Sequence, residues 1–301
     1  MRILLAVDGS VSSDHATQLV NSLALPDGSV IRAVAVQEPT LDALGMTWLG
    51  AGDEGVVPDL DESLSATHFR DAVAVAERTL ARPGRTVEGF LLKGRPGSQI
   101  VDEAKAFEAD LVVVGSRGHG TIATMVLGST ASEVVDHAPC PVLVARGDRL
   151  GRVAFADDGS PSARTAEEVL GRWPIFDGVD LRVVGVAEVA VPMAAGFTAG
   201  LYDQVMASYT QSVDAARKER RDEVAATAAR LATSGRTVKA ELLEGDPAHT
   251  LIEYARTDAI GTMVLGTHGR TGFARLVLGS VARNVLLHVA CSVLVVRERK
   301  G

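Results

Sequence analysis

The stretch DLVVVGSRGHGTIATMVLGSTASEVVDHA, residues 110–138, decides the fold. A run of apolar, β-branched residues ends at Gly115, a glycine-containing segment follows, and a helical pattern begins near Ser129. A run such as LVVV is apolar on both faces, which a strand tolerates when helices cover both sides of a parallel sheet. The stretch therefore predicts a buried parallel strand, a loop at its carboxyl end and a covering helix.

The chain carries this stretch twice. Residues 266–297 match residues 115–146 at 15 of 32 positions and keep the spacing Gly-x2-Gly-x9-Gly-Ser. RILLAVDGS at 2–10 returns as RVAFADDGS at 152–160, and VEGFLLKGRP at 87–96 returns as VKAELLEGDP at 238–247. A chain of 301 residues has room for two domains of about 150 residues. We place the join near Asp148, which gives domains 1–148 and 149–301.

Each repeat alternates short apolar runs with amphipathic segments. In the first repeat strands are expected at 2–7, 30–36, 86–92, 110–115 and 141–145. The i, i+3, i+4 spacing of covering helices occurs in 15–25, 66–81 and 98–108. The alternation predicts an α/β fold of two tandem, doubly wound, five-stranded parallel-sheet domains.

The last strand of each repeat, PVLVAR or SVLVVR, is apolar and would lie at a sheet edge. An apolar edge exposes unpaired main-chain groups, so we expect the two halves to pack through these strands around a pseudo-two-fold axis. Two such chains are further expected to associate as a homodimer.

Composition limits the classes of partner. The net charge is -8, and the Lys and Arg residues are scattered among acidic ones, which argues against nucleic acid or an anionic membrane. No stretch approaches the roughly 18 apolar residues of a membrane helix. The two cysteines, Cys140 and Cys291, cannot build a disulfide framework. These features together predict a cytoplasmic protein.

The glycines after the fourth strand suggest a ligand site, because ligands of such folds bind at the carboxyl ends of the strands. Gly115 and Gly118 are expected to turn the chain with positive φ and to let a ligand approach main-chain N–H groups. Gly128 and Ser129 would open a helix whose unpaired N–H groups and dipole favour an anion. The alternative is that these are turn and cap glycines without a ligand, but finding the pattern twice favours an anion site.

The glycine pattern, the Asp-Gly-Ser after the first strand and the endings APCPVLVAR and VACSVLVVR resemble the universal stress protein family, in its tandem ATP-binding form. The resemblance covers essentially the whole chain. It implies the strand order 3-2-1-4-5 and an ATP across the ends of the first and fourth strands, with any Mg²⁺ carried on the phosphates. In the first repeat it implies ATP contacts from Ala6, Asp8, Val36, Val114, Gly115, Arg117, Gly118, Gly128, Ser129 and Thr130. In the second repeat it implies the same from Ala156, Asp158, Val186, Leu265, Gly266, His268, Gly269, Gly279, Ser280 and Val281.

The chemistry of Asp8 and Asp158 agrees with this assignment, because a carboxylate accepts hydrogen bonds from two vicinal ribose hydroxyls. The alternative for both is an Asx turn made by the Asp-Gly pair. Asp157 stands where the first repeat has Val7, so we expect the second pocket to be more acidic and weaker for a polyphosphate.

These observations favour an ATP-binding stress-response or signalling protein in which ATP occupancy controls conformation or partner binding. No catalytic residues are assigned, since the sequence has no Gly-x4-Gly-Lys-[Ser/Thr] motif. Three alternatives stay open: a slow ATPase of the adenine nucleotide α-hydrolase type, a nicotinamide-binding Rossmann protein and a nucleotide-free stress scaffold. The α-hydrolase type would be expected to show Ser-Gly-Gly-x-Asp-Ser, and a Rossmann protein would place its glycines after the first strand.

The Gly-containing segments 39–58 and 189–203 each follow a second strand. We hypothesise that they are lids beside the adenine pocket, the alternative being plain surface loops.

Overall fold

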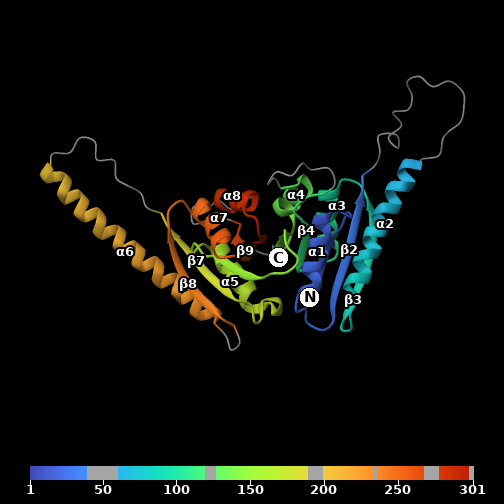
Figure 1. Cartoon of the computed structure of the whole chain (residues 1–301), viewed down its shortest axis with the longest axis horizontal. Helices are drawn as coiled ribbons and strands as arrows, with labels where there is room; N and C mark the ends of the chain where they lie inside the picture. Colours follow the sequence, from blue (N-terminus) through green and yellow to red (C-terminus); the bar gives the residue numbers. More distant parts are fainter. Residues whose placement is uncertain (39–59, 119–126, 189–198, 233–235, 268–277, 298–301) are drawn as a thin grey trace, which may run out of the picture. The chain divides into compact units, whose positions relative to one another are not determined.

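A computed structural model of the chain describes residues 1–38, 60–118, 127–188, 199–232, 236–267 and 278–297. Its contacts divide the chain into two compact units (Figure 1). Unit 1 consists of Met1–Leu150 with Cys291–Gly301, and unit 2 consists of Gly151–Ala290.

Unit 1 is built on a sheet with the strand order β3-β2-β1-β4-β5-β10. The strands are β1 (Arg2–Ala6), β2 (Ser29–Gln37), β3 (Arg85–Lys93), β4 (Leu111–Gly115), β5 (Val142–Ala145) and β10 (Ser292–Val296). The first five pair in parallel, and β10 pairs antiparallel with β5. The predicted order 3-2-1-4-5 is confirmed.

Helices cover both faces of this sheet. They are α1 (Val11–Ser22), α2 (Leu60–Leu80), α3 (Pro96–Ala106) and α4 (Ser129–His137). Helix α1 contacts α2, and α3 contacts α4, as expected when right-handed crossovers run outward in opposite directions from the central strands β1 and β4. Leu111, Val112 and Val113 of β4 are fully buried, which explains why this strand is apolar on both faces.

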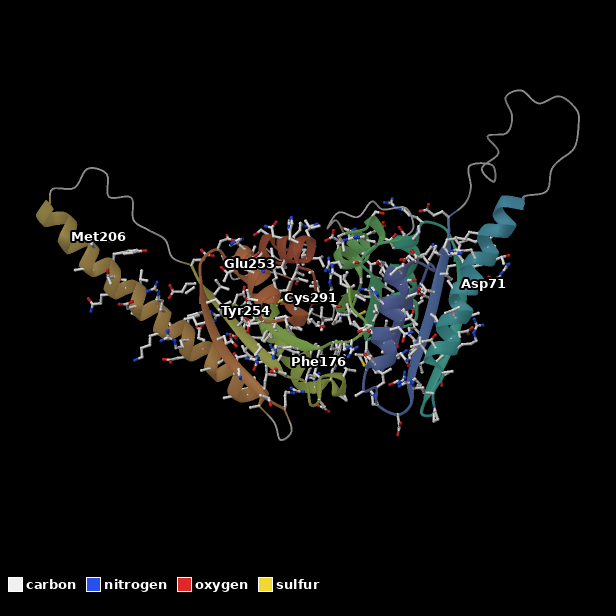
Figure 2. All side chains as sticks on the ribbon, in the orientation of Figure 1. Asp71, Phe176, Met206, Glu253, Tyr254 and Cys291 are labelled. Atoms are coloured by element: carbon white, nitrogen blue, oxygen red, sulfur yellow. The ribbon has the colours of Figure 1, made fainter. Side chains whose placement is uncertain are left out.

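Unit 2 repeats this plan with the order β9-β6-β7-β8, all parallel. Its strands are β6 (Arg152–Ala156), β7 (Leu181–Ala187), β8 (Val238–Glu244) and β9 (Ile260–Gly266). Its helices are α5 (Pro161–Arg172), α6 (Ala199–Leu231), α7 (Pro247–Thr257) and α8 (Ser280–His288), with a 3-10 turn at Pro174–Phe176. Figure 1 shows α6 running along β7 and β8, and Phe176 is one of the large, fully buried side chains of this unit (Figure 2).

The observed units do not coincide with the predicted domains 1–148 and 149–301, because β10 near the end of the chain groups with unit 1. The division falls after Leu150, but β10 belongs by its contacts to unit 1, where Val293 pairs with Val144 and Leu294 with Leu143. All residues of both strands are buried. The two apolar last strands therefore cover each other's edges, as their sequences predict.

Gly115 and Gly266 let the ends of β4 and β9 lie close to helices α1 and α5. A Cβ on Gly115 would lie 2.8 Å from the main-chain carbon of Ser12 in α1, and one on Gly266 would lie 2.9 Å from that of Ser162 in α5. We expect Gly115→Ala and Gly266→Ala each to lower the free energy of unfolding by about 1–3 kcal/mol, because main chain cannot move aside without strain. Urea titration followed by circular dichroism measures this.

Gly171→Ala in α5 is the matched control for both substitutions. Its Cβ would meet nothing closer than Leu231 Cδ2 at 3.7 Å, and alanine is the better helix former. If Gly115→Ala has the same unfolding midpoint as the Gly171→Ala control, α1 and β4 can move apart without lowering the free energy of unfolding, and the expectation is wrong.

The lid hypothesis falls on residues 39–58 and 189–198, which lie outside the described residues, while residues 199–203 form the start of α6. Among the described helices, none combines the length and the apolar character needed to cross a membrane.

Candidate functional site

A pocket of about 460 Å³ opens in unit 1 where β1, β2 and β4 end. This is the edge at which the strand order reverses between β1 and β4, the usual ligand position in open α/β sheets. All ten residues proposed for the first repeat line this pocket. They are Ala6, Asp8, Val36, Val114, Gly115, Arg117, Gly118, Gly128, Ser129 and Thr130. Their contact with ATP stays a prediction.

The turn after β1 positions Asp8. Gly9 has φ +79°, and Asp8 Oδ1 accepts a hydrogen bond from Ser10 N at 2.9 Å, so the Asx turn forms. Ser10 then caps α1, its Oγ accepting from Ser13 N at 3.2 Å. Asp8 lines the pocket as well, and its Oδ2 lies beside Gly118. The Asx turn and a ligand-facing carboxylate are therefore compatible.

Gly118 lies beside the Asp8 carboxylate. A Cβ at Gly118 would lie 2.7 Å from Asp8 Oδ2. The backbone at this position can approach the carboxylate only because no side chain intervenes.

The expected positive φ of Gly115 and Gly118 is wrong. Neither is among the glycines with positive φ, which include Gly9 and Gly94 instead. The physical reason is that Gly115 serves close approach to α1, as described above, and Gly118 serves close approach to Asp8. Neither position requires a left-handed backbone.

Helix α4 begins at the edge of the pocket. Gly128 is its N-cap and supplies no side-chain hydrogen bond, while Gly128 N donates to Ser116 O at 2.9 Å. The first N–H groups of a helix have no partner within the helix, and its dipole makes this end partly positive. Ser129 and Thr130, which line the pocket, thus bring N–H and hydroxyl donors to it.

Arg117 provides a cation at the same end of the pocket. Its main-chain oxygen accepts from Ser10 Oγ at 3.3 Å, which ties the two loops together. Its Nε is buried and has no hydrogen-bond partner within the described residues. A buried donor without a partner is costly, so this atom is suited to an anionic ligand.

Several lining residues were not foreseen from the sequence. Phe69 of α2, Pro96 and Ile100 of α3, and Glu38 after β2 all border the pocket. His68, next to Phe69, has Nε2 2.9 Å from Asp8 O. The available signal was the His68–Phe69 pair itself, because these are the only two rings in the segment Ala66–Leu80 of α2.

The second repeat reproduces the local geometry. Asp158 Oδ1 accepts from Ser160 N at 3.0 Å, Gly159 has φ +73°, and Ser160 Oγ accepts from Ala163 N at 3.1 Å. Gly279 caps α8, and its N donates to Thr267 O at 2.8 Å.

The remaining predicted residues of the second repeat divide into two groups. Ala156, Val186, Leu265 and Gly266 lie at the carboxyl ends of β6, β7 and β9, and Ser280 and Val281 begin α8. His268 and Gly269 lie outside the described residues.

The side chain of Asp157 points toward α6, contrary to the expectation that it makes the second pocket more acidic. Its carboxylate is buried and accepts hydrogen bonds from Thr227 Oγ1 of α6 at 3.0 Å and from Gly159 N at 2.8 Å. Arg220 of α6 lies 3.9 Å from Asp157 Oδ1. The carboxylate is thus turned toward α6 and is held there by donors and by an opposite charge.

The described residues contain no cluster of three or more His, Cys, Asp or Glu side chains suited to a metal ion.

A family model matches both repeats of the chain. The model of the universal stress protein family matches residues 1–146 and again 150–297. A universal stress protein of Mycolicibacterium smegmatis is 26% identical over 308 residues, covering 99% of this chain and 97% of that relative. One of Thermus aquaticus is 34% identical over 144 residues, covering 48% of this chain and 97% of the relative.

Solved structures show the same fold. A universal stress protein from Archaeoglobus fulgidus has a TM-score of 0.62 at 18% identity, with 98% of each chain covered. A functionally unknown protein from Pseudomonas aeruginosa has a TM-score of 0.54 at 16% identity, covering 98% of this chain and 92% of the other. Since the family model matches both repeats, the chain belongs to the universal stress protein family and carries two of its domains in tandem.

Proposed function

We propose that unit 1 binds ATP and that ATP occupancy controls the conformation or the partner choice of this stress protein, with little or no hydrolysis. The observation that carries the proposal is one pocket that joins the Asp8 carboxylate, an apolar wall, the Gly118 backbone and Arg117. Its volume of about 460 Å³ falls among those of small-molecule sites.

Each part of the pocket suits one part of the nucleotide. Val34 and Val36 offer an apolar surface to the base, and the Asp8 carboxylate is an acceptor for ribose hydroxyls. The start of α4 and the Arg117 guanidinium suit the phosphates, because N–H donors and positive charge converge there. The buried, unpartnered Arg117 Nε supports the fit of an anion at this end.

The weak or absent hydrolysis is inferred from the residues around the glycine loop. The chain lacks the P-loop lysine that reaches the terminal phosphates, and Asp8, the carboxylate beside Gly118, already accepts from Ser10 N. These groups bind and orient a nucleotide, but none is placed to activate water.

Helix α2 is our candidate for the element that responds to ATP. Phe69 borders the pocket, and His68 Nε2 lies 2.9 Å from the main-chain oxygen of Asp8. A ligand that orders the Asp8 turn therefore also orders this face of α2.

The experiment has two readouts. Mass spectrometry of nucleotide released from the denatured protein, with calorimetric titration of ATP into nucleotide-free protein, is expected to show ATP binding. Hydrogen exchange is expected to slow by about tenfold across residues 60–80 when ATP is added, since ligand binding stabilises the bound state against local opening. Absence of both effects would favour the nucleotide-free scaffold.

We further propose that the chain acts in the cytoplasm and associates as a homodimer. The support for a reducing compartment is that neither Cys140 nor Cys291 forms a disulfide. Light scattering of purified protein tests the homodimer, which predicts twice the mass of the 31.5 kDa chain.

A further inference from the structure

Strands β4 and β5 are paired neighbours, and each leads into an arginine just beyond its carboxyl end. Gly115 of β4 pairs with Ala145 of β5, and Ser116 N donates to Ala145 O at 3.1 Å. Arg117 follows Ser116 and Arg146 follows Ala145, so both arginines leave the sheet one residue beyond this hydrogen bond. Only Arg117 lines the pocket.

Strand β10 fixes Arg146. Arg146 Nη1 donates to the main-chain oxygen of Cys291 at 3.2 Å, and Arg146 N donates to Ser292 Oγ at 3.0 Å. Gly147 N donates to the same hydroxyl at 3.3 Å. The side chain and main chain of Arg146 are therefore both held by the first residues of β10.

The two guanidinium groups interact electrostatically. Burial, chiefly, together with the charge of Arg117 lowers the pKa of Arg146 to about 10. The group still carries its charge at neutral pH. Two like charges in a partly desolvated corner repel, and an anion in the adjacent pocket relieves that repulsion.

We propose that Arg146 is a positioning residue of the phosphate subsite, which directs Arg117 into the pocket and adds positive potential there, while β10 of the second repeat holds it in place. This inference rests on the proposed ATP binding. It makes the pocket of unit 1 dependent on the last strand of the chain. It also predicts that selectivity for polyphosphate over uncharged nucleoside is set by a residue that does not touch the ligand.

The matched control is Arg297, the residue that corresponds to Arg146 in the second repeat. Its guanidinium donates to the main-chain oxygens of Asp136 at 3.2 Å and Ala138 at 3.1 Å, and also to that of Val135, at the end of α4. Arg297→Met removes an arginine of the same strand pair, but one whose bonds go to helix carbonyls.

The test compares the affinities of ATP and adenosine by calorimetry. We expect Arg146→Met to weaken ATP about tenfold and adenosine less than twofold. We expect Arg146→Lys to restore most of the ATP affinity, because the charge returns. Arg297→Met should lower stability and change both affinities by the same factor.

Ser292→Ala covers the case in which Arg146→Met does not fold. It removes the hydroxyl that accepts from Arg146 N and Gly147 N, and we expect about threefold weaker ATP binding with unchanged adenosine binding. If Arg146→Met folds and binds ATP as tightly as the wild type, this inference alone is overturned. If Arg146→Met does not fold, wild-type ATP affinity in Ser292→Ala overturns it in the same way. A wild-type protein that binds neither ATP nor adenosine overturns the proposed function and this inference together.

Discussion

Replacing Gly118 with valine is expected to weaken ATP binding by about 100-fold or more while leaving the fold intact. The new Cβ would lie 2.7 Å from Asp8 Oδ2, closer than real side chains approach, and the valine methyls would enter the pocket that Gly118 lines. The Asp8 carboxylate must move aside to admit the Cβ, and its displacement removes a charged hydrogen bond to the ligand worth about 1.5–3 kcal/mol. Calorimetric titration with ATP measures the loss.

The fold should tolerate this change because Gly118 is exposed and does not have positive φ. Gly171→Val in α5 is the matched control, since its Cβ meets only Leu231 Cδ2, at 3.7 Å. Gly118→Val with unaltered ATP affinity would mean that the nucleotide binds elsewhere, and the pocket beside Asp8 would lose its assigned role.

The architecture was accessible from sequence because it depends on local patterns. The fully apolar run at 111–114 requires cover on both faces, and the alternation of strands and helices leaves few topologies. The residues around the pocket were accessible for another reason: Asp8 and Gly118 each belong to a motif that occurs in both repeats. Because both motifs occur twice, a binding role for these residues was favoured over that of ordinary turn residues.

The wrong prediction for the φ of Gly115 and the missed pocket residues depend on contacts between residues distant in the sequence. Whether Gly115 turns with positive φ or admits a neighbour depends on Ser12, about a hundred residues earlier, and only the packed structure shows the 2.8 Å approach. The same holds for Phe69, which reaches the pocket from α2. No local pattern specifies that geometry.

Asp157 is an instructive exception, since its orientation was within reach. Asp157 and Asp158 directly follow β6, which ends at Ala156. In the first repeat the position of Asp157 is taken by Val7, an apolar residue that is buried. This correspondence argued for a side chain turned into the fold, where Thr227 Oγ1 donates to Asp157 Oδ2, and against a more acidic pocket.

Asp8→Asn is expected to weaken ATP binding by about ten- to 100-fold, because it removes the charge and replaces one acceptor oxygen with an NH2 donor. The asparagine Oδ1 can still accept from Ser10 N, as Asp8 Oδ1 does at 2.9 Å, so the turn and the cap of α1 should persist. The group facing the sugar becomes neutral, and hydrogen bonds to an ionised acceptor are about twice as strong as neutral ones. Calorimetry with ATP and with 2′-deoxy-ATP separates this effect from a general loss of structure.

Wild type and Asp8→Asn, each measured with ATP and with 2′-deoxy-ATP, form a double-mutant cycle. If Asp8 binds the ribose hydroxyls, the substitution should cost much less with the deoxy ligand, because one of the partners is already missing. Equal losses for the two ligands would assign Asp8 to the turn alone. Asp158→Asn is the matched control: Asp158 Oδ1 accepts from Ser160 N at 3.0 Å in the same kind of turn. Because Asp158 belongs to unit 2, its substitution should leave the affinity of the unit 1 pocket unchanged, and any site that unit 2 forms would be lost as a separate step in the titration.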